Sequence, residues 1–111
     1  LKDIRKEFET ELFIPGSKEG LNVELDKAFR LNDFITMGEL IAYDALNRNE
    51  SCGGHFREEY QTEEGEAKRD DENFFYVACW EYQGSDDKAP VLYKEPLVYE
   101  AIKVQTRNYK S

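Results

Sequence analysis

The sequence has few of the cysteine and histidine residues that stabilise domains through disulfide bonds or bound metal ions. It contains two cysteines, Cys52 and Cys79, and a single histidine, His55. Two cysteines are too few for a disulfide scaffold, so a reduced, cytosolic protein is expected. Cys52 and His55 would need two further ligands to bind structural zinc, and only Cys79 and scattered carboxylates remain. We therefore expect no metal site, and we expect no Cys–His catalytic pair, because nucleophile, base and orienting group must converge.

Positive charge and long apolar runs are also scarce. The chain has 15 Lys and Arg against 24 Asp and Glu, which gives a net charge of −9. Nucleic acids and anionic lipids are bound by clustered cations, so neither is an expected partner. No apolar run approaches the ~20 residues that a membrane span needs. The first residue is Leu1 and not Met, from which we expect a fragment of a longer protein.

The hydrophobic and aromatic content of the chain predicts one folded domain. Hydrophobic residues make up 40% of the 111 residues and aromatic residues 14%, more than a disordered tail carries. A chain of this length can bury one modest core.

The first half of the sequence predicts two helices. Leu1, Ile4, Phe8 and Leu12 recur at helical spacing, and Pro15-Gly16 ends that segment. A second, longer helix is predicted from Asn22, a suitable N-cap, to about Arg48. Its apolar face comprises Leu25, Ala28, Phe29, Phe34, Ile35, Leu40, Ile41, Ala45 and Leu46. The first helix cannot cover so wide a face alone, so we expect an incomplete helical bundle.

The second half predicts loops and strands. A glycine-rich loop at residues 51–55 precedes an acidic surface segment at residues 58–72. Aromatic and β-branched residues predict strands at residues 73–82, 90–95 and 97–104, with Pro96 restricted to an edge or a bulge. Since residues 73–82 are apolar on both faces, we expect both faces to be covered in the complete protein. The predicted fold is mainly α with a β extension: a two-helix, spectrin-repeat-like bundle portion at residues 1–50, then a tail with a β-hairpin at residues 51–111.

The residues taken alone do not assemble an active site. Gly53-Gly54 follows a predicted helix and lacks the context of a phosphate-binding loop. Asp70-Asp71-Glu72 lacks the spacing of an EF-hand. We therefore assign no catalytic, cofactor-binding or metal-binding residue within these 111 residues.

One block of sequence resembles a known family. Residues 49–73 read NESCGGHFREEYQTEEGEAKRDDEN, which is similar to the segment after the last bundle helix in the flavoprotein subunit of succinate dehydrogenase and fumarate reductase. That family carries E-S-R-G-A-H-x-R and, later, R-D-D before a hydrophobic strand. The matching residues here are Arg48, Glu50, Ser51, Gly53, His55, Arg57, Glu59, Tyr60, Arg69, Asp70 and Asp71. Arg107 and Tyr109 resemble the family's terminal Arg-Ser-Tyr, and the long helix resembles its third bundle helix.

The block departs from the family pattern at two positions. Cys52 and Gly54 stand where the family has Arg and Ala, so any contact made by that arginine is absent. L-aspartate oxidase resembles the same family and carries a related loop, but its tail lacks the long R-D-D-plus-hairpin arrangement. It is therefore the second-ranked resemblance for this chain.

The resemblance implies the C-terminal domain of an oxidoreductase that interconverts succinate and fumarate. By that resemblance, a covalent FAD lies in an upstream domain and substrate lies between it and a capping domain. Electrons pass to an iron–sulfur subunit and then to membrane quinone, on the cytoplasmic face of the inner membrane. By the same resemblance, His55 and Arg57 would fix the turn from bundle to tail. They belong to an expected structural and interdomain motif made of Glu50, Ser51, Gly53, His55, Arg57, Arg69, Asp70, Asp71, Arg107 and Tyr109. A free-standing acidic interaction domain remains the alternative from another class.

Overall fold

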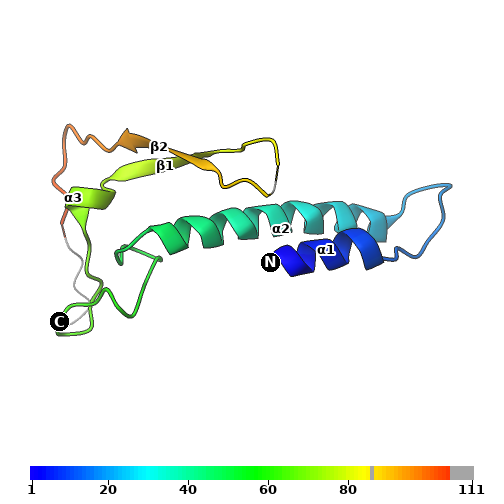
Figure 1. The fold of residues 1–111 in the computed structure, drawn as a ribbon, viewed down its shortest axis with the longest axis horizontal. Coiled ribbons are helices and arrows are strands. Elements are labelled where there is room, and N and C mark those ends of the chain that lie inside the picture. Colours follow the sequence, from blue (N-terminus) through cyan, green and yellow to red (C-terminus); the bar gives the residue numbers. More distant parts are fainter. Residues whose placement is uncertain (86, 106–111) are drawn as a thin grey trace. The chain divides into compact units, whose positions relative to one another are not determined.

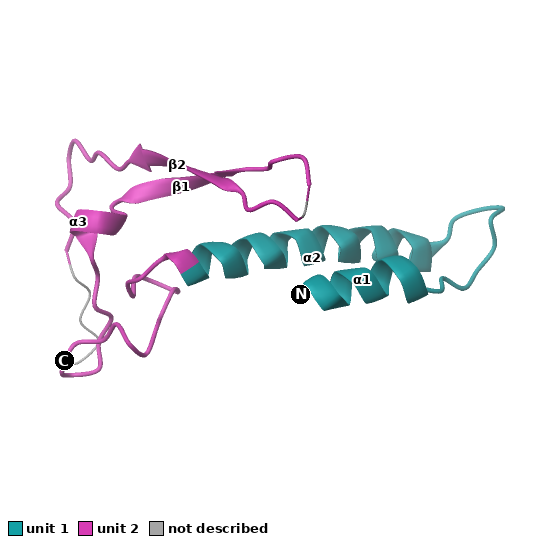
Figure 2. Ribbon diagram, viewed as in Figure 1, with its two compact units in different colours: residues 1–46 teal, residues 47–111 magenta. Residues whose placement is uncertain are grey.

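The computed structural model describes residues 1–85 and 87–105. The chain divides into two compact units, Leu1–Leu46 and Asn47–Ser111, which are coloured separately in Figure 2. Each unit is described by itself below. Arg48 and Glu50, which the sequence assigned to the helical portion, belong to the second unit.

Unit 1 is a pair of helices that lie side by side and run in opposite directions (Figure 1). Helix α1 spans Lys2–Glu11 and α2 spans Val23–Asn47. Both predicted helices are therefore confirmed to within a residue or two. The predicted cap of α2 is also confirmed, because Asn22 Oδ1 accepts hydrogen bonds from the backbone N–H groups of Glu24 and Leu25, each at 3.1 Å.

The connection between α1 and α2 depends on Gly16. Its φ of +121° is a conformation that side-chain-bearing residues avoid. A Cβ there would lie 2.6 Å from Asn22 Nδ2, the atom that donates to the carbonyl of Pro15 at 3.2 Å. Gly16 therefore lets the capping residue of α2 also close the loop.

Helix α2 presents a largely uncovered apolar face. Ile35 is the buried hydrophobic residue of the described chain, at 6% exposure. Exposed apolar side chains along α2 include Leu25, Phe29, Phe34, Met37 and Ile41. The expectation that α1 cannot cover this face is thus confirmed. None of the described helices is both long and apolar enough to cross a membrane.

A partly buried ion pair joins the two helices of unit 1. Arg5 Nη2 lies 2.9 Å from Glu39 Oε2 and donates at 3.1 Å to the hydroxyl of Thr36. The hydrogen bond from Arg5 lowers the pKa of the Glu39 carboxyl, against the opposing effect of burial.

Unit 2 contains a short helix and a two-stranded antiparallel sheet. The helix α3 spans Asp71–Phe74, and the strands β1 and β2 span Tyr76–Glu81 and Val91–Pro96. The register pairs Tyr76 with Pro96 and Glu81 with Val91. Exposure alternates along β1, with Tyr76, Ala78 and Trp80 half-buried and the intervening side chains exposed.

The structure corrects two strand predictions. Asn73 and Phe74 belong to α3 and not to a strand, because the Asp70 side chain accepts a hydrogen bond from the Asn73 amide and starts a helical turn. The predicted return strand at residues 97–104 is wrong, since no described residue of that segment is in a strand. Pro96 ends β2, and the amide of Leu97, the next residue, donates to Phe75 O at 3.3 Å. The strand predicted at residues 90–95 is confirmed with a shift of one residue.

The described chain thus combines helices with one antiparallel hairpin, as the predicted fold class states. The resemblance of the helices to a spectrin repeat stays a prediction.

The Arg5–Glu39 pair predicts a pH-dependent stability of unit 1. A carboxyl whose pKa is lowered by folding stabilises the fold above its unfolded pKa and loses that effect as pH falls through its folded pKa. Glu39→Gln should therefore lower the melting temperature at pH 7 by about 3 °C, and by less at pH 3. Circular dichroism at both pH values measures this, with the exposed Glu9→Gln as the matched control. An equal loss for both variants at pH 7 would contradict the assigned role.

Candidate functional site

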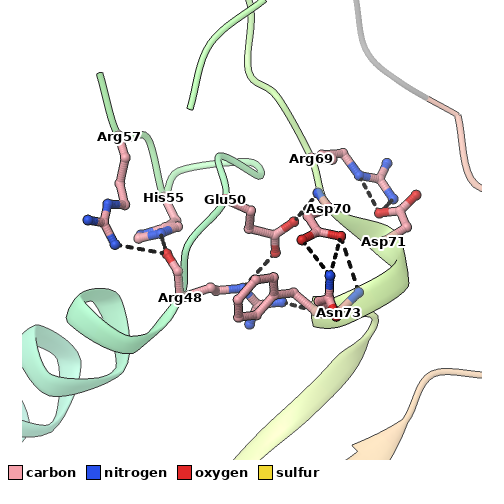
Figure 3. A network of polar contacts seen from close by, with 9 residues as sticks. Arg48, Glu50, His55, Arg57, Arg69, Asp70, Asp71 and Asn73 are labelled. Carbon is pink, nitrogen blue, oxygen red and sulfur yellow. Dashed lines mark hydrogen bonds and ion pairs between the residues drawn. The ribbon is translucent and has the colours of Figure 1, made fainter. Parts of the chain in front are cut away.

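Two polar residues are buried where the chain leaves α2. Glu50 is 2% exposed and Ser51 is fully buried. A buried carboxylate is costly unless it is paired and hydrogen-bonded. Glu50 Oε1 accepts from Arg48 Nε at 2.7 Å, and Oε2 accepts from the Asp70 amide at 2.9 Å (Figure 3). The carboxylate therefore ties the end of α2 to the start of α3.

Arg48 extends this connection to the hairpin. Its Nη2 donates to the carbonyl of Phe74 at 2.7 Å. The guanidinium carbon lies 5.9 Å from the ring centroid of Phe74 and 5.7 Å from that of Tyr76, within range of cation–π attraction. Arg48 is thus the residue that reaches β1 from the helix end.

Ser51 holds the following loop by both its side chain and its backbone. Its Oγ accepts from the Arg57 amide at 2.8 Å and donates to the Arg57 carbonyl at 3.1 Å. The Ser51 amide donates to Lys68 O at 2.9 Å. The single donor of this hydroxyl is used within the chain, and its full burial keeps the remaining lone pair away from solvent, which indicates a structural group.

Gly53 makes the tight turn between Ser51 and Arg57 possible. Cys52 and His55 exchange backbone hydrogen bonds, at 2.8 Å from the Cys52 amide and 3.1 Å from the His55 amide. Gly53 has φ +58°, and a Cβ there would meet open space. The glycine is therefore needed for its left-handed backbone and not for close approach of another group. Cys52 and Cys79 are free thiols.

His55 and Arg57 converge on the backbone carbonyl of Arg48, the residue that follows α2. His55 Nε2 lies 2.9 Å from Arg48 O, and Arg57 Nη1 donates to the same carbonyl at 3.4 Å (Figure 3). Arg57 Nη1 also donates to Asn49 Oδ1 at 2.9 Å. A cation at a helix C-terminus is favoured by the helix dipole. These bonds place both side chains against the residue that follows the helix. That His55 and Arg57 fix the turn from bundle to tail stays a prediction.

The three residues Arg69, Asp70 and Asp71 make different contacts. Asp70 caps α3 through Asn73, while Arg69 Nε donates to Asp71 Oδ1 at 2.9 Å. This hydrogen bond raises the pKa of Arg69, against the opposing effect of burial. Arg69 Nη1 also donates to Gln105 O at 3.2 Å.

The structure brings most of the predicted motif together. Glu50, His55, Arg57 and Asp70 form one network around Arg48, and Arg69 and Asp71 lie at its edge beside Asp70 (Figure 3). Ser51 joins the network through its hydrogen bonds with Arg57. The predicted residues Arg107 and Tyr109 lie outside the described residues. The sequence match to the family included Arg48, but the predicted motif did not. The signal for including it was its position two residues before Glu50, where an arginine can pair with the carboxylate.

Within the described residues, the network offers neither an unpaired buried polar side-chain atom nor a cluster of metal-binding side chains. In the described part of the chain, every buried side-chain nitrogen and oxygen has a hydrogen-bond partner. The same residues contain no group of three or more His, Cys, Asp and Glu side chains that could hold a metal. What the arrangement can do is fix the backbone of unit 2 from Arg48 to the start of β1.

Glu50→Gln tests the network. An amide offers a donor where the carboxylate accepts from Arg48 or from the Asp70 amide, so one buried donor faces another. The free energy of unfolding should fall by about 3 kcal/mol. Urea denaturation followed by the fluorescence of Trp80, the single tryptophan, measures it. Glu63→Gln, at an exposed position, is the control. If both variants lowered the free energy of unfolding by the same amount, the network's role would be refuted.

One comparison with known proteins finds a match. No curated protein and no solved structure matches the chain. A family model for the C-terminal part of the fumarate reductase flavoprotein matches residues 1–109, which is nearly the whole chain and includes both units. The resemblance stated from residues 49–73 is thereby confirmed. The chain belongs to the fumarate reductase flavoprotein C-terminal family.

Proposed function

We propose that these residues form the supporting C-terminal domain of a flavoprotein subunit that interconverts succinate and fumarate. The match of residues 1–109 to the family carries the proposal. In this proposal the domain binds no cofactor and touches no substrate. Its task is to hold the rest of the subunit in shape.

The buried network supports a structural task. The side chains of Arg48, Glu50 and Ser51 are engaged with the chain itself. A catalytic acid or base needs a route to substrate, and the Glu50 carboxylate is buried with both oxygens accepting hydrogen bonds. The network fixes the path of the chain from α2 to β1 and carries no reaction step.

The exposed apolar surfaces supply the contacts that a supporting domain needs. Phe29 and Phe34 of α2 are 66% and 67% exposed, and Val77 of β1 is 49% exposed. Apolar surface of this kind marks contact with another protein surface. In the proposal, a further bundle helix and the flavin domain of the same chain cover these faces. The motif formed by Glu50, Ser51, Gly53, His55, Arg57, Arg69, Asp70 and Asp71, with Arg107 and Tyr109, then lies at the interdomain border.

The remaining parts of the proposal concern the subunit as a whole. A covalent FAD belongs to an upstream domain, and a capping domain encloses the substrate with it. Electrons pass to an iron–sulfur subunit and indirectly to a quinone-reactive membrane subunit. The flavoprotein is then cytoplasmic and peripheral to the inner membrane.

The test uses the full-length protein and the 111-residue chain side by side. Both are purified, the visible flavin spectrum is recorded, and dye-linked oxidation of succinate is assayed. The full-length protein should carry a flavin that stays bound on denaturation and should oxidise succinate. The 111-residue chain should carry no flavin and show no turnover.

The outcomes separate the alternatives. A flavin band or succinate turnover from the 111-residue chain alone would overturn the supporting role. Oxidation of L-aspartate in place of succinate by the full-length protein would identify the oxidase alternative. A full-length protein without flavin would favour an acidic interaction domain with no enzymatic role.

A further inference from the structure

The segment that follows β2 contacts residues that lie just before β1 and just before α3. We define residues 97–105 as the C-terminal strap. At its start the Leu97 amide donates to Phe75 O at 3.3 Å. The Tyr99 ring packs edge-on against the Phe75 ring, with centroids 5.8 Å apart. At its far end Gln105 O accepts from Arg69 Nη1 at 3.2 Å.

In the part of unit 2 that the structure describes, hydrogen bonds join the strap to the rest of the unit at Leu97 and Gln105. Side chains between these ends are exposed, including Val98 at 82% and Ile102 at 65%. A segment with few buried contacts and exposed side chains belongs to the low-stability end of a fold.

Arg69 is oriented independently of the strap. Its Nε donates to Asp71 Oδ1 at 2.9 Å, and its side chain is 18% exposed. The guanidinium is therefore held by Asp71 while Nη1 stays directed at Gln105 O. A planar guanidinium can make both bonds at once because its donors diverge.

We propose that Arg69 is a clasp that keeps the C-terminal strap closed, and that the strap opens as a unit while the Glu50 network stays intact. Opening breaks the bonds at Gln105 and Leu97 and separates Tyr99 from Phe75. It leaves the bonds of Glu50 to Arg48 and to the Asp70 amide in place, because neither involves the strap. The opened state uncovers Phe75, the residue directly before β1.

Limited proteolysis of the full-length protein with a lysine-specific protease tests the clasp. Lys103 lies in the strap and Lys88 lies in the β1–β2 turn, so one digestion reports on both segments. Arg69→Gln removes the clasp without changing any cleavage site of this protease. Cleavage after Lys103 should accelerate about three- to tenfold under conditions where opening equilibrates before cleavage. Cleavage after Lys88 should keep its rate.

Two further variants keep the test decisive. Asp71→Asn leaves Arg69 present but weakens its orientation, and should accelerate cleavage after Lys103 by less than Arg69→Gln does. Arg30→Gln, which breaks the surface pair with Asp26 in α2, should leave both rates unchanged. An unchanged rate after Lys103 in Arg69→Gln would overturn the proposal. So would a joint rise after Lys88 and Lys103, which would make Arg69 a support of the whole unit.

Discussion

The burial of the Glu50 carboxylate constrains unit 2 more than any other feature. Its two oxygens accept from Arg48 Nε and from the Asp70 amide, two groups that are 22 positions apart in the chain and that come from the end of α2 and the start of α3. Because a buried charge must be compensated, both partners are fixed in place. The Arg48 guanidinium then reaches Phe74 O and the rings of Phe74, in α3, and Tyr76, the first residue of β1. Within unit 2, Arg48, the start of α3 and the start of the hairpin are thus linked through one ion pair.

The two units contrast in how they are held. Unit 2 depends on a polar network with satisfied buried groups, whereas unit 1 has Ile35 as its buried hydrophobic residue and a partly buried ion pair between its helices. Exposed apolar side chains on α2 are the feature of unit 1 that a supporting role within a larger flavoprotein explains. The proposal therefore assigns chain geometry to the network and domain contact to the helix face.

Periodicity predicted the helices well because local sequence determines them: the apolar spacing, the Asn22 cap and Pro15-Gly16 are all within a few residues of the ends they set. The strands were predicted less well, because strand formation depends on a partner. Residues 97–104 have a strand-forming composition, but no described strand pairs with them. Asn73 lies in a helical turn because its amide donates to the capping side chain of Asp70. The motif residues came from a family resemblance, while the pairing of Glu50 with Arg48 and the Asp70 amide required the folded structure.

A double-mutant cycle between Arg48 and Glu50 tests the central claim most directly. Arg48→Met, Glu50→Gln and the double variant are compared with the unmodified 111-residue chain by urea denaturation, followed by Trp80 fluorescence. If the ion pair links the helix end to the hairpin, the two substitutions should be strongly non-additive, with a coupling free energy of about 2 kcal/mol. Additive effects, with a coupling near zero, would show that the two residues act separately and would contradict the account.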